Sequence, residues 1–211
     1  MQEINLKDTV SIVTFGQICQ SRLSDLNKCV TDEAAKEDYS EAAVIISELN
    51  DFSKRLSQKN VKGNKLYMDG LRNRITDCHL KWVMQAKTYE QLLVAQKTYT
   101  KDLEKHIEYA KSLLSGTGKV SFTADSNLRK RIDELELTRT IAVSFASHIE
   151  LCRKNAQFMA SKLQSTVMTV LPLLNSEIMF EGNEASIKAA KKIIDKVNGD
   201  FSNSLERESR N

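Results

Sequence analysis

The chain has 211 residues and a formal net charge of +3, with 41% hydrophobic and 28% charged residues. This composition supports a hydrophobic core, and the charge is too small to predict nucleic-acid binding, which shows as a concentrated basic face. One proline and seven glycines are too few for a fold with many turns, so we expect long uninterrupted helices. No apolar run reaches the roughly 18 residues that span a bilayer, and the first residues do not resemble a signal peptide. We therefore expect a cytoplasmic protein without a membrane span.

Residues 1–62 are predicted to form N-terminal helices that pack on the rest of the chain. The first helix covers roughly Asp8–Val30 and is interrupted at Gly16. The second is predicted to start after Thr31, a residue suited to an N-cap, because two acidic residues follow it where the helix dipole favours carboxylates. The apolar face of that second helix contains Ala42, Ile45, Leu49, Phe52 and Leu56. A turn is expected at Asn60–Asn64.

The clearest pattern begins at Leu71 and predicts one very long helix. Apolar residues recur there at an unbroken spacing of four and three residues, as in a coiled-coil seam. The seam positions are Leu71, Ile75, Cys78, Trp82, Gln85, Tyr89, Leu92, Gln96, Tyr99, Leu103, His106, Ala110 and Leu113. Three of these residues are polar. At about 1.5 Å per residue, the helix would extend roughly 65 Å.

A loop near 115–126 is expected to connect this helix to another long one that starts near Asn127. The core stripe of that helix runs through Leu128, Ile132, Leu135 and Ala142, then slips by one residue and continues through Phe145, Ile149, Cys152, Ala156, Met159, Leu163, Thr166 and Val170. A second stripe of Leu137, Ile141, Leu151 and Phe158 predicts a helix that is buried on two sides. Pro172 is expected to kink or end it.

These patterns predict an all-α fold, an elongated helical bundle built on a long antiparallel coiled-coil-like helical hairpin over residues 63–180. Residues 181–211 are expected to form a short helix, Ala185–Val197, followed by a disordered tail from Asp200.

No residue pattern in the sequence points to catalysis, to a cofactor or to a metal site. Four cysteines are scattered without a paired motif, which predicts free thiols. Cys78 and Cys152 lie on apolar stripes, where a cysteine behaves as a small hydrophobic residue. None of the histidines is interpreted as having another type of metal-ligating residue four positions away. His106 is interpreted as a polar residue that sets the register of the seam. We therefore expect a protein that is not an enzyme.

One long segment resembles a known family. The residues that carry the likeness are Arg131, Asp133, Leu135, Leu137, Arg139, Ile141, Ala142, Ala146, Ile149, Leu151, Asn155, Lys162, Pro172, Leu173 and Ile178. They resemble the long motif of the TelA-like toxic anion resistance family, associated with bacterial tellurite resistance, and the proline–leucine step that follows it. Weaker support comes from Tyr99, Leu103, Ile107 and Ala110, and from the pair Phe15–Gly16. Where the family commonly has Trp-Lys after the proline–leucine step, this chain has Leu174-Asn175.

The resemblance implies a stress role through protein partners. The motif residues proposed for interaction are Asp133, Arg139, Asn155, Lys162 and Pro172. Arg139 is predicted to be buried and paired, with Glu136 as its best partner on the same helix, unless another helix supplies one. The leading hypothesis is a non-enzymatic scaffold in resistance to tellurite or related anions. The alternatives are direct thiol chemistry on the oxyanion, and a generic coiled-coil protein that forms homo-oligomers.

Overall fold

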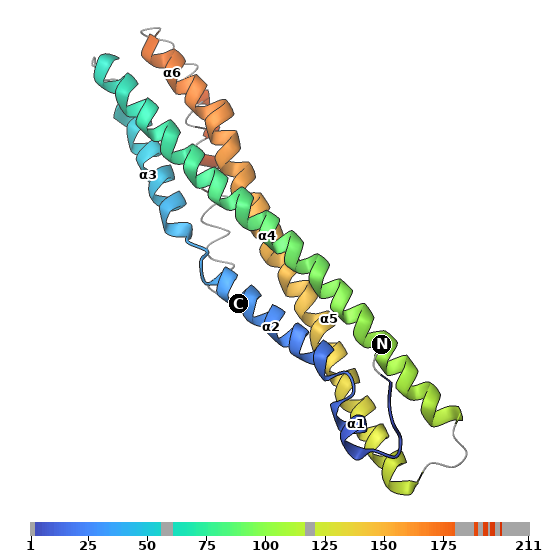
Figure 1. Ribbon diagram of the computed structural model, residues 1–211. Coiled ribbons are helices and arrows are strands. Elements are labelled where there is room, and N and C mark those ends of the chain that lie inside the picture. Colours follow the sequence, from blue (N-terminus) through green and yellow to red (C-terminus); the bar gives the residue numbers. More distant parts are fainter. Residues whose placement is uncertain are drawn as a thin grey trace. The chain divides into compact units, whose positions relative to one another are not determined.

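The computed structural model describes residues 3–55, 61–116 and 121–179, with seven further residues between 188 and 199. Within these residues every regular element is helical and no strand occurs, which confirms the all-α fold. The elements, shown in Figure 1, are α1 (Thr9–Thr14), α2 (Gln17–Ala34), α3 (Tyr39–Arg55), α4 (Val61–Gly116), α5 (Phe122–Ser165), the π-helix η1 (Thr166–Val170) and α6 (Leu171–Met179). No described helix is both long and apolar enough to cross a membrane.

The chain divides into two compact units that do not follow its order. Unit 1 contains Met1–Lys36 and Lys87–Arg153, and unit 2 contains Glu37–Ala86 and Lys154–Asn211. Helices α4 and α5 therefore each contribute residues to both units. The described residues of the predicted C-terminal helix Ala185–Val197 are helical, whereas the predicted tail and Leu56 lie outside the described residues.

Unit 1 is a packing of α1 and α2 on one end of α4 and α5. Its core contains Ile4, Ile12, Phe15, Cys19, Leu23, Leu103, Ile107, Ala110, Ala124, Leu128, Ile132, Leu135 and Ala142. Within this unit α4 and α5 run antiparallel. Residues with increasing numbers on α4 contact residues with decreasing numbers on α5. The pairs are Gln96 with Ala142, Glu104 with Arg139, and Lys111 with Glu136.

The second predicted helix begins later than the sequence predicts. Thr31 lies inside α2, where its hydroxyl donates a hydrogen bond to the Asn27 carbonyl at 3.0 Å. Helix α3 begins at Tyr39 instead, and the backbone N–H of Ser40 donates to the Asp38 carboxylate at 2.9 Å. Asp38 accepts this bond more strongly than a threonine hydroxyl would, because it is charged. The predicted apolar face of α3 is confirmed, since Ala42, Ile45, Leu49 and Phe52 are all buried.

The long seam is confirmed along α4. Eight of its positions are buried, namely Leu71, Ile75, Cys78, Trp82, Tyr89, Gln96, Leu103 and Ala110, and the other five are half-buried. The predicted turn at Asn60–Asn64 is wrong from Val61 onward, because α4 already begins there. The predicted loop near 115–126 is also too long, since α4 ends at Gly116 and α5 begins at Phe122. A single glycine costs a helix only about 1 kcal/mol, so Gly63 does not prevent α4 from beginning at Val61. The early start of α5 is stabilised by Ser121, whose hydroxyl accepts a hydrogen bond from the Ala124 N–H at 3.2 Å.

Pro172 changes the helix type without ending the helical run. The N–H of Leu171 donates to the Thr166 carbonyl across a π turn, and α6 then continues through Pro172 to Met179. Proline lacks an N–H and its ring clashes with the carbonyl four residues earlier. The wider π turn immediately before it is a known way to interrupt the α-helical ladder. The predicted disturbance is therefore real, but it is local.

The predicted burial of α5 on two sides is wrong. The core stripe is covered, yet the second stripe is exposed: Leu137 is 63%, Ile141 53%, Leu151 48% and Phe158 38% accessible. These residues lie on the side of the helix opposite Leu135 and Ala142, at the 100° spacing of residues around an α-helix. Apolar residues alone could not show which of the two stripes the rest of the chain covers.

Candidate functional site

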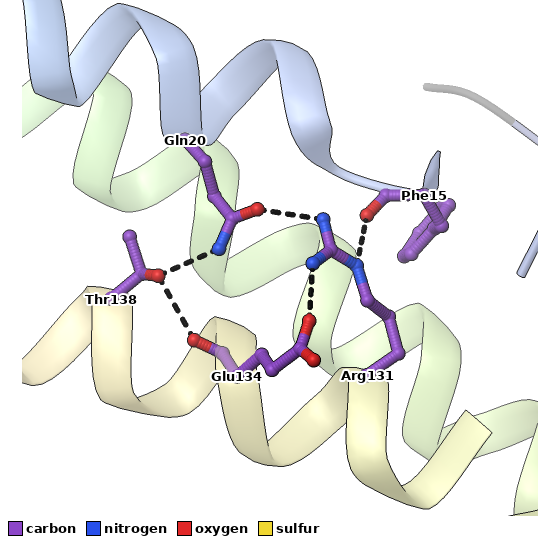
Figure 2. Close-up of polar contacts among 5 residues, drawn as sticks. All are labelled: Phe15, Gln20, Arg131, Glu134 and Thr138. Atoms are coloured by element: carbon purple, nitrogen blue, oxygen red, sulfur yellow. Dashed lines mark hydrogen bonds and ion pairs between the residues drawn. The ribbon is translucent and has the colours of Figure 1, made fainter. Parts of the chain in front are cut away.

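The most organised polar arrangement in unit 1 surrounds Arg131, whose side chain is 8% exposed. Figure 2 shows its guanidinium between α5 and the junction of α1 and α2. The Nε donates to the Phe15 carbonyl at 2.8 Å, Nη1 to the Glu134 carboxylate at 2.6 Å, and Nη2 to the Gln20 side-chain oxygen at 2.7 Å. The Gln20 amide then donates to Thr138 Oγ1 at 2.8 Å, and that hydroxyl donates to the Glu134 carbonyl at 2.9 Å. We call these five residues the Arg131 cluster.

The break between α1 and α2 explains why this cluster forms. Gly16 has φ = +72°, a left-handed conformation that is costly for residues with a Cβ. The Phe15 carbonyl lies at this turn, and the Nε of Arg131 donates a hydrogen bond to it. The Phe15 ring is fully buried, with centroids 5.2 Å from His106 and 5.9 Å from Tyr109. A buried arginine of α5 therefore contacts the junction between α1 and α2.

The bonding of Arg131 favours a clamp over a ligand site. All three guanidinium nitrogens donate to groups of the protein, and an arginine remains charged throughout the physiological range. Glu134 compensates this charge while its own side chain is 61% exposed, so only one member of the ion pair loses its hydration. The cluster therefore ties the α1–α2 junction to α5 and includes a carboxylate that solvent reaches.

The segment that carries Arg131 also matches a known family. Residues 118–211 match the family model described as toxic anion resistance protein (TelA). The match confirms the TelA-like resemblance over α5, η1 and α6, and it leaves Phe15–Gly16 and the weaker stretch on α4 outside. No curated protein and no solved structure matches the chain.

Two of the TelA-motif residues proposed for interaction lie in unit 1. Asp133 is exposed on α5, and Arg139 is 47% exposed at its side chain, so its predicted burial is wrong. Its Nε donates to the Glu104 carboxylate of α4 at 2.8 Å, whereas Glu136 pairs with Lys111. Position 139 follows the stripe by spacing, which slips only after Ala142, but its long side chain pairs with Glu104 of α4 and remains half exposed to solvent. The buried arginine of the motif is Arg131, to which the sequence reasoning gave no role.

The other three TelA-motif residues lie in unit 2. Asn155 is half-buried and has a partner, and Pro172 is exposed in the first turn of α6. The half-buried Lys162 holds its ammonium 5.1 Å from the centroid of the Phe158 ring, a cation–π geometry. The five residues therefore belong to two different units, and their role in interaction stays a prediction.

A shallow groove of about 650 Å³ lies beside Asp133 in unit 1. Its lining residues are Lys111, Leu114, Ser115, Arg129, Ile132, Asp133 and Glu136. Its cations are engaged with carboxylates, since Lys111 pairs with Glu136 and Arg129 with Asp125. Two positive and two negative side chains line the groove, so it does not concentrate the positive charge that would favour an anion.

The thiols are mostly shielded, as predicted for two of them. Cys19, Cys78 and Cys152 are buried, whereas Cys29 is exposed. Burial raises the pKa of the Cys78 thiol to about 11, and it also raises the pKa of Cys19, with a smaller contribution from Asp102. A thiol with a raised pKa forms less of the nucleophilic thiolate. Only Cys29 therefore combines a free thiol with access to solvent among the four.

The histidines contact two of these thiols. His148 precedes Cys152 by four residues, which corrects the sequence interpretation, and its Nε2 lies 3.8 Å from the sulfur. His106 Nδ1 lies 3.8 Å from the Cys19 sulfur, but the same nitrogen lies 2.7 Å from the Asp102 carbonyl, to which it donates. Among the described residues, no group of three or more His, Cys, Asp or Glu side chains is placed to hold a metal ion.

Proposed function

We propose that this protein acts in resistance to tellurite or related toxic anions as a non-enzymatic helical scaffold that works through protein partners. The observation that carries the proposal is the match of residues 118–211 to the toxic anion resistance protein (TelA) family. The scaffold role draws support from Arg131, whose three nitrogens are all used to join helices. It also draws support from the exposed apolar side chains on α5, because such residues are available to a partner.

The second candidate is direct chemistry of a thiol on the oxyanion, and Cys29 is the observation that favours it. This cysteine is exposed, and a thiolate is the form that reacts. The buried Cys19 and Cys78, with their raised pKa values, are poorly suited to that reaction. The two candidates therefore differ in whether resistance depends on one identifiable side chain.

A resistance assay separates the two candidates. Cells lacking the protein would be complemented with the wild type, with Cys29→Ser, and with a variant in which all four cysteines are replaced, and growth would be measured across tellurite concentrations. The scaffold proposal expects the wild-type and Cys29→Ser strains to grow alike, and the cysteine-free variant to retain resistance if circular dichroism shows that it folds. Loss of resistance in folded Cys29→Ser would establish the thiol mechanism instead. Failure of the wild type to confer any resistance would overturn the role itself.

The partner hypothesis needs its own measurement. Tagged wild-type protein would be recovered from cells grown with and without tellurite, beside a Leu137→Glu, Ile141→Glu variant of the exposed α5 side chains. We expect defined proteins to be retained by the wild type and lost from the variant. Identical recovery by both chains would exclude this face as the interaction surface. A matched Val94→Glu variant of α4, also exposed at 62%, controls for a general effect of added charge.

A further inference from the structure

One polar side chain lies in the centre of the unit 1 seam. Gln96 of α4 is fully buried, with 0% exposure. Its Nε2 donates to the backbone carbonyl of Ala142 on α5 at 2.7 Å, and its Oε1 is buried without a hydrogen-bond partner. A buried acceptor without a donor costs free energy that an apolar side chain of similar size would not. Gln96 therefore stabilises the core less than an apolar side chain of similar size would.

Access to the Ala142 carbonyl depends on the small side chain of that residue. The α5 stripe places Leu135 one heptad before Ala142 and Ile149 one heptad after it, and all three are buried. If α4 moved by one heptad along α5, Gln96 would face Leu135 or Ile149. Their larger side chains would cover the backbone and leave both ends of the amide without partners. Such a shift would also separate Glu104 from Arg139 and Lys111 from Glu136, but these ion pairs are exposed and contribute little to the choice of register.

We infer that Gln96 fixes the register of α4 against α5 in unit 1, because its amide can donate a hydrogen bond to the α5 backbone only where it lies opposite Ala142. A single polar residue in a helical seam sets register at a cost in stability in other coiled coils. Here the partner is a backbone carbonyl that Gln96 can reach because the residue carrying it is an alanine. The inference concerns the fold of unit 1 and does not depend on the proposed function.

The test measures the distance between α4 and α5 directly. Spin labels would be attached at Lys101→Cys and Thr140→Cys, two exposed positions of unit 1, in a Cys29→Ser background that removes the exposed native thiol. Pulsed electron spin resonance would compare this full-length chain with the same chain carrying Gln96→Leu. A shift of one heptad moves one helix along the other by about 10 Å. The Cys29→Ser chain alone reports any labelling of the buried cysteines.

We expect one distance with Gln96 and an additional, displaced distance with Gln96→Leu. Gln85→Leu is the matched control, since it makes the same change on the same seam at a half-buried position in unit 2, and it should leave the single distance unchanged. If Gln96→Leu does not fold by circular dichroism, Gln96→Met repeats the experiment with an unbranched side chain. A single unchanged distance in a folded Gln96 variant would overturn the inference, whether the variant is more or less stable than the parent.

Discussion

Burial separates two arginines that lie eight residues apart on the same helix. Arg131 is enclosed and donates to Phe15, Gln20 and Glu134, whereas Arg139 is 47% exposed and pairs with Glu104 across the edge of the contact. An ion pair in water contributes little because hydration competes with it. A buried guanidinium that satisfies a carbonyl contributes more, since its removal leaves that carbonyl without a donor.

Arg131→Ala should therefore lower the free energy of unfolding by about 2–3 kcal/mol, through the lost charge-assisted hydrogen bonds and the unsatisfied Phe15 carbonyl. Arg139→Ala is the matched control and should cost less than about 1 kcal/mol. Urea denaturation followed by circular dichroism measures both. Equal losses in the two variants would show that the Arg131 cluster adds nothing beyond a surface ion pair.

Cys78 provides a prediction about alkaline pH. Burial, followed by the charge of Glu41, raises its pKa from 9.0 to about 11 in the folded protein. As the pH rises past 9.0 the unfolded chain loses this proton first, so stability that is fully present below pH 9 falls as the pH approaches 11. Denaturation at several pH values should give a shallower decline for Cys78→Ala than for the wild type. A Cys78→Ala slope equal to that of the wild type would contradict the prediction.

At the scale of elements, Gly16 decides where the first predicted helix divides. Its φ of +72° separates α1 from α2, and a Cβ built on it would lie 3.1 Å from Leu135 Cδ2. Both the backbone conformation and the close approach of Leu135 on α5 therefore disfavour a side chain at this position. Gly70, inside α4, has open space within 4 Å of the position that a Cβ would occupy, and it only weakens its helix.

These two glycines should respond in opposite directions to alanine. Gly16→Ala should destabilise the protein by roughly 2 kcal/mol, from the left-handed conformation together with the contact on Leu135. Gly70→Ala should stabilise it by about 0.5–1 kcal/mol, because alanine is the better helix former in open space. Thermal and urea unfolding of both variants checks the pair of signs. A stabilising Gly16→Ala would mean that the α1–α2 junction adopts another conformation in solution.

For the whole molecule, the two helices that both units share predict cooperative unfolding. Helices α4 and α5 contribute to both units, so unfolding either unit would disrupt a helix that the other uses. The protein's single tryptophan, Trp82, reports on unit 2, where it is 3% exposed with its ring centroid 4.8 Å from that of Tyr39. Helical circular dichroism reports on both units.

We expect the Trp82 fluorescence transition and the circular dichroism transition to coincide in urea, which is a test of two-state unfolding. The signal at equilibrium should also be predominantly helical. Two separated transitions would show that the units unfold independently in spite of the helices they share. The Tyr39→Leu variant, which removes the ring beside Trp82, tests whether the fluorescence change reports packing in unit 2.

The sequence by itself determined the helical class, the α4 seam, the core stripe of α5 and the break at Gly16, because these depend on periodicity and on the conformational range of single residues. It also indicated a resemblance to the TelA family, through a motif that runs along α5 and into α6. Tertiary structure decided which side of α5 is covered, and so it exposed Leu137 and Arg139 and buried Arg131. It also supplied partners from distant segments, such as Phe15 for Arg131 and Ala142 for Gln96. The spacing of residues fixes directions around one helix, whereas burial depends on which other helix packs there.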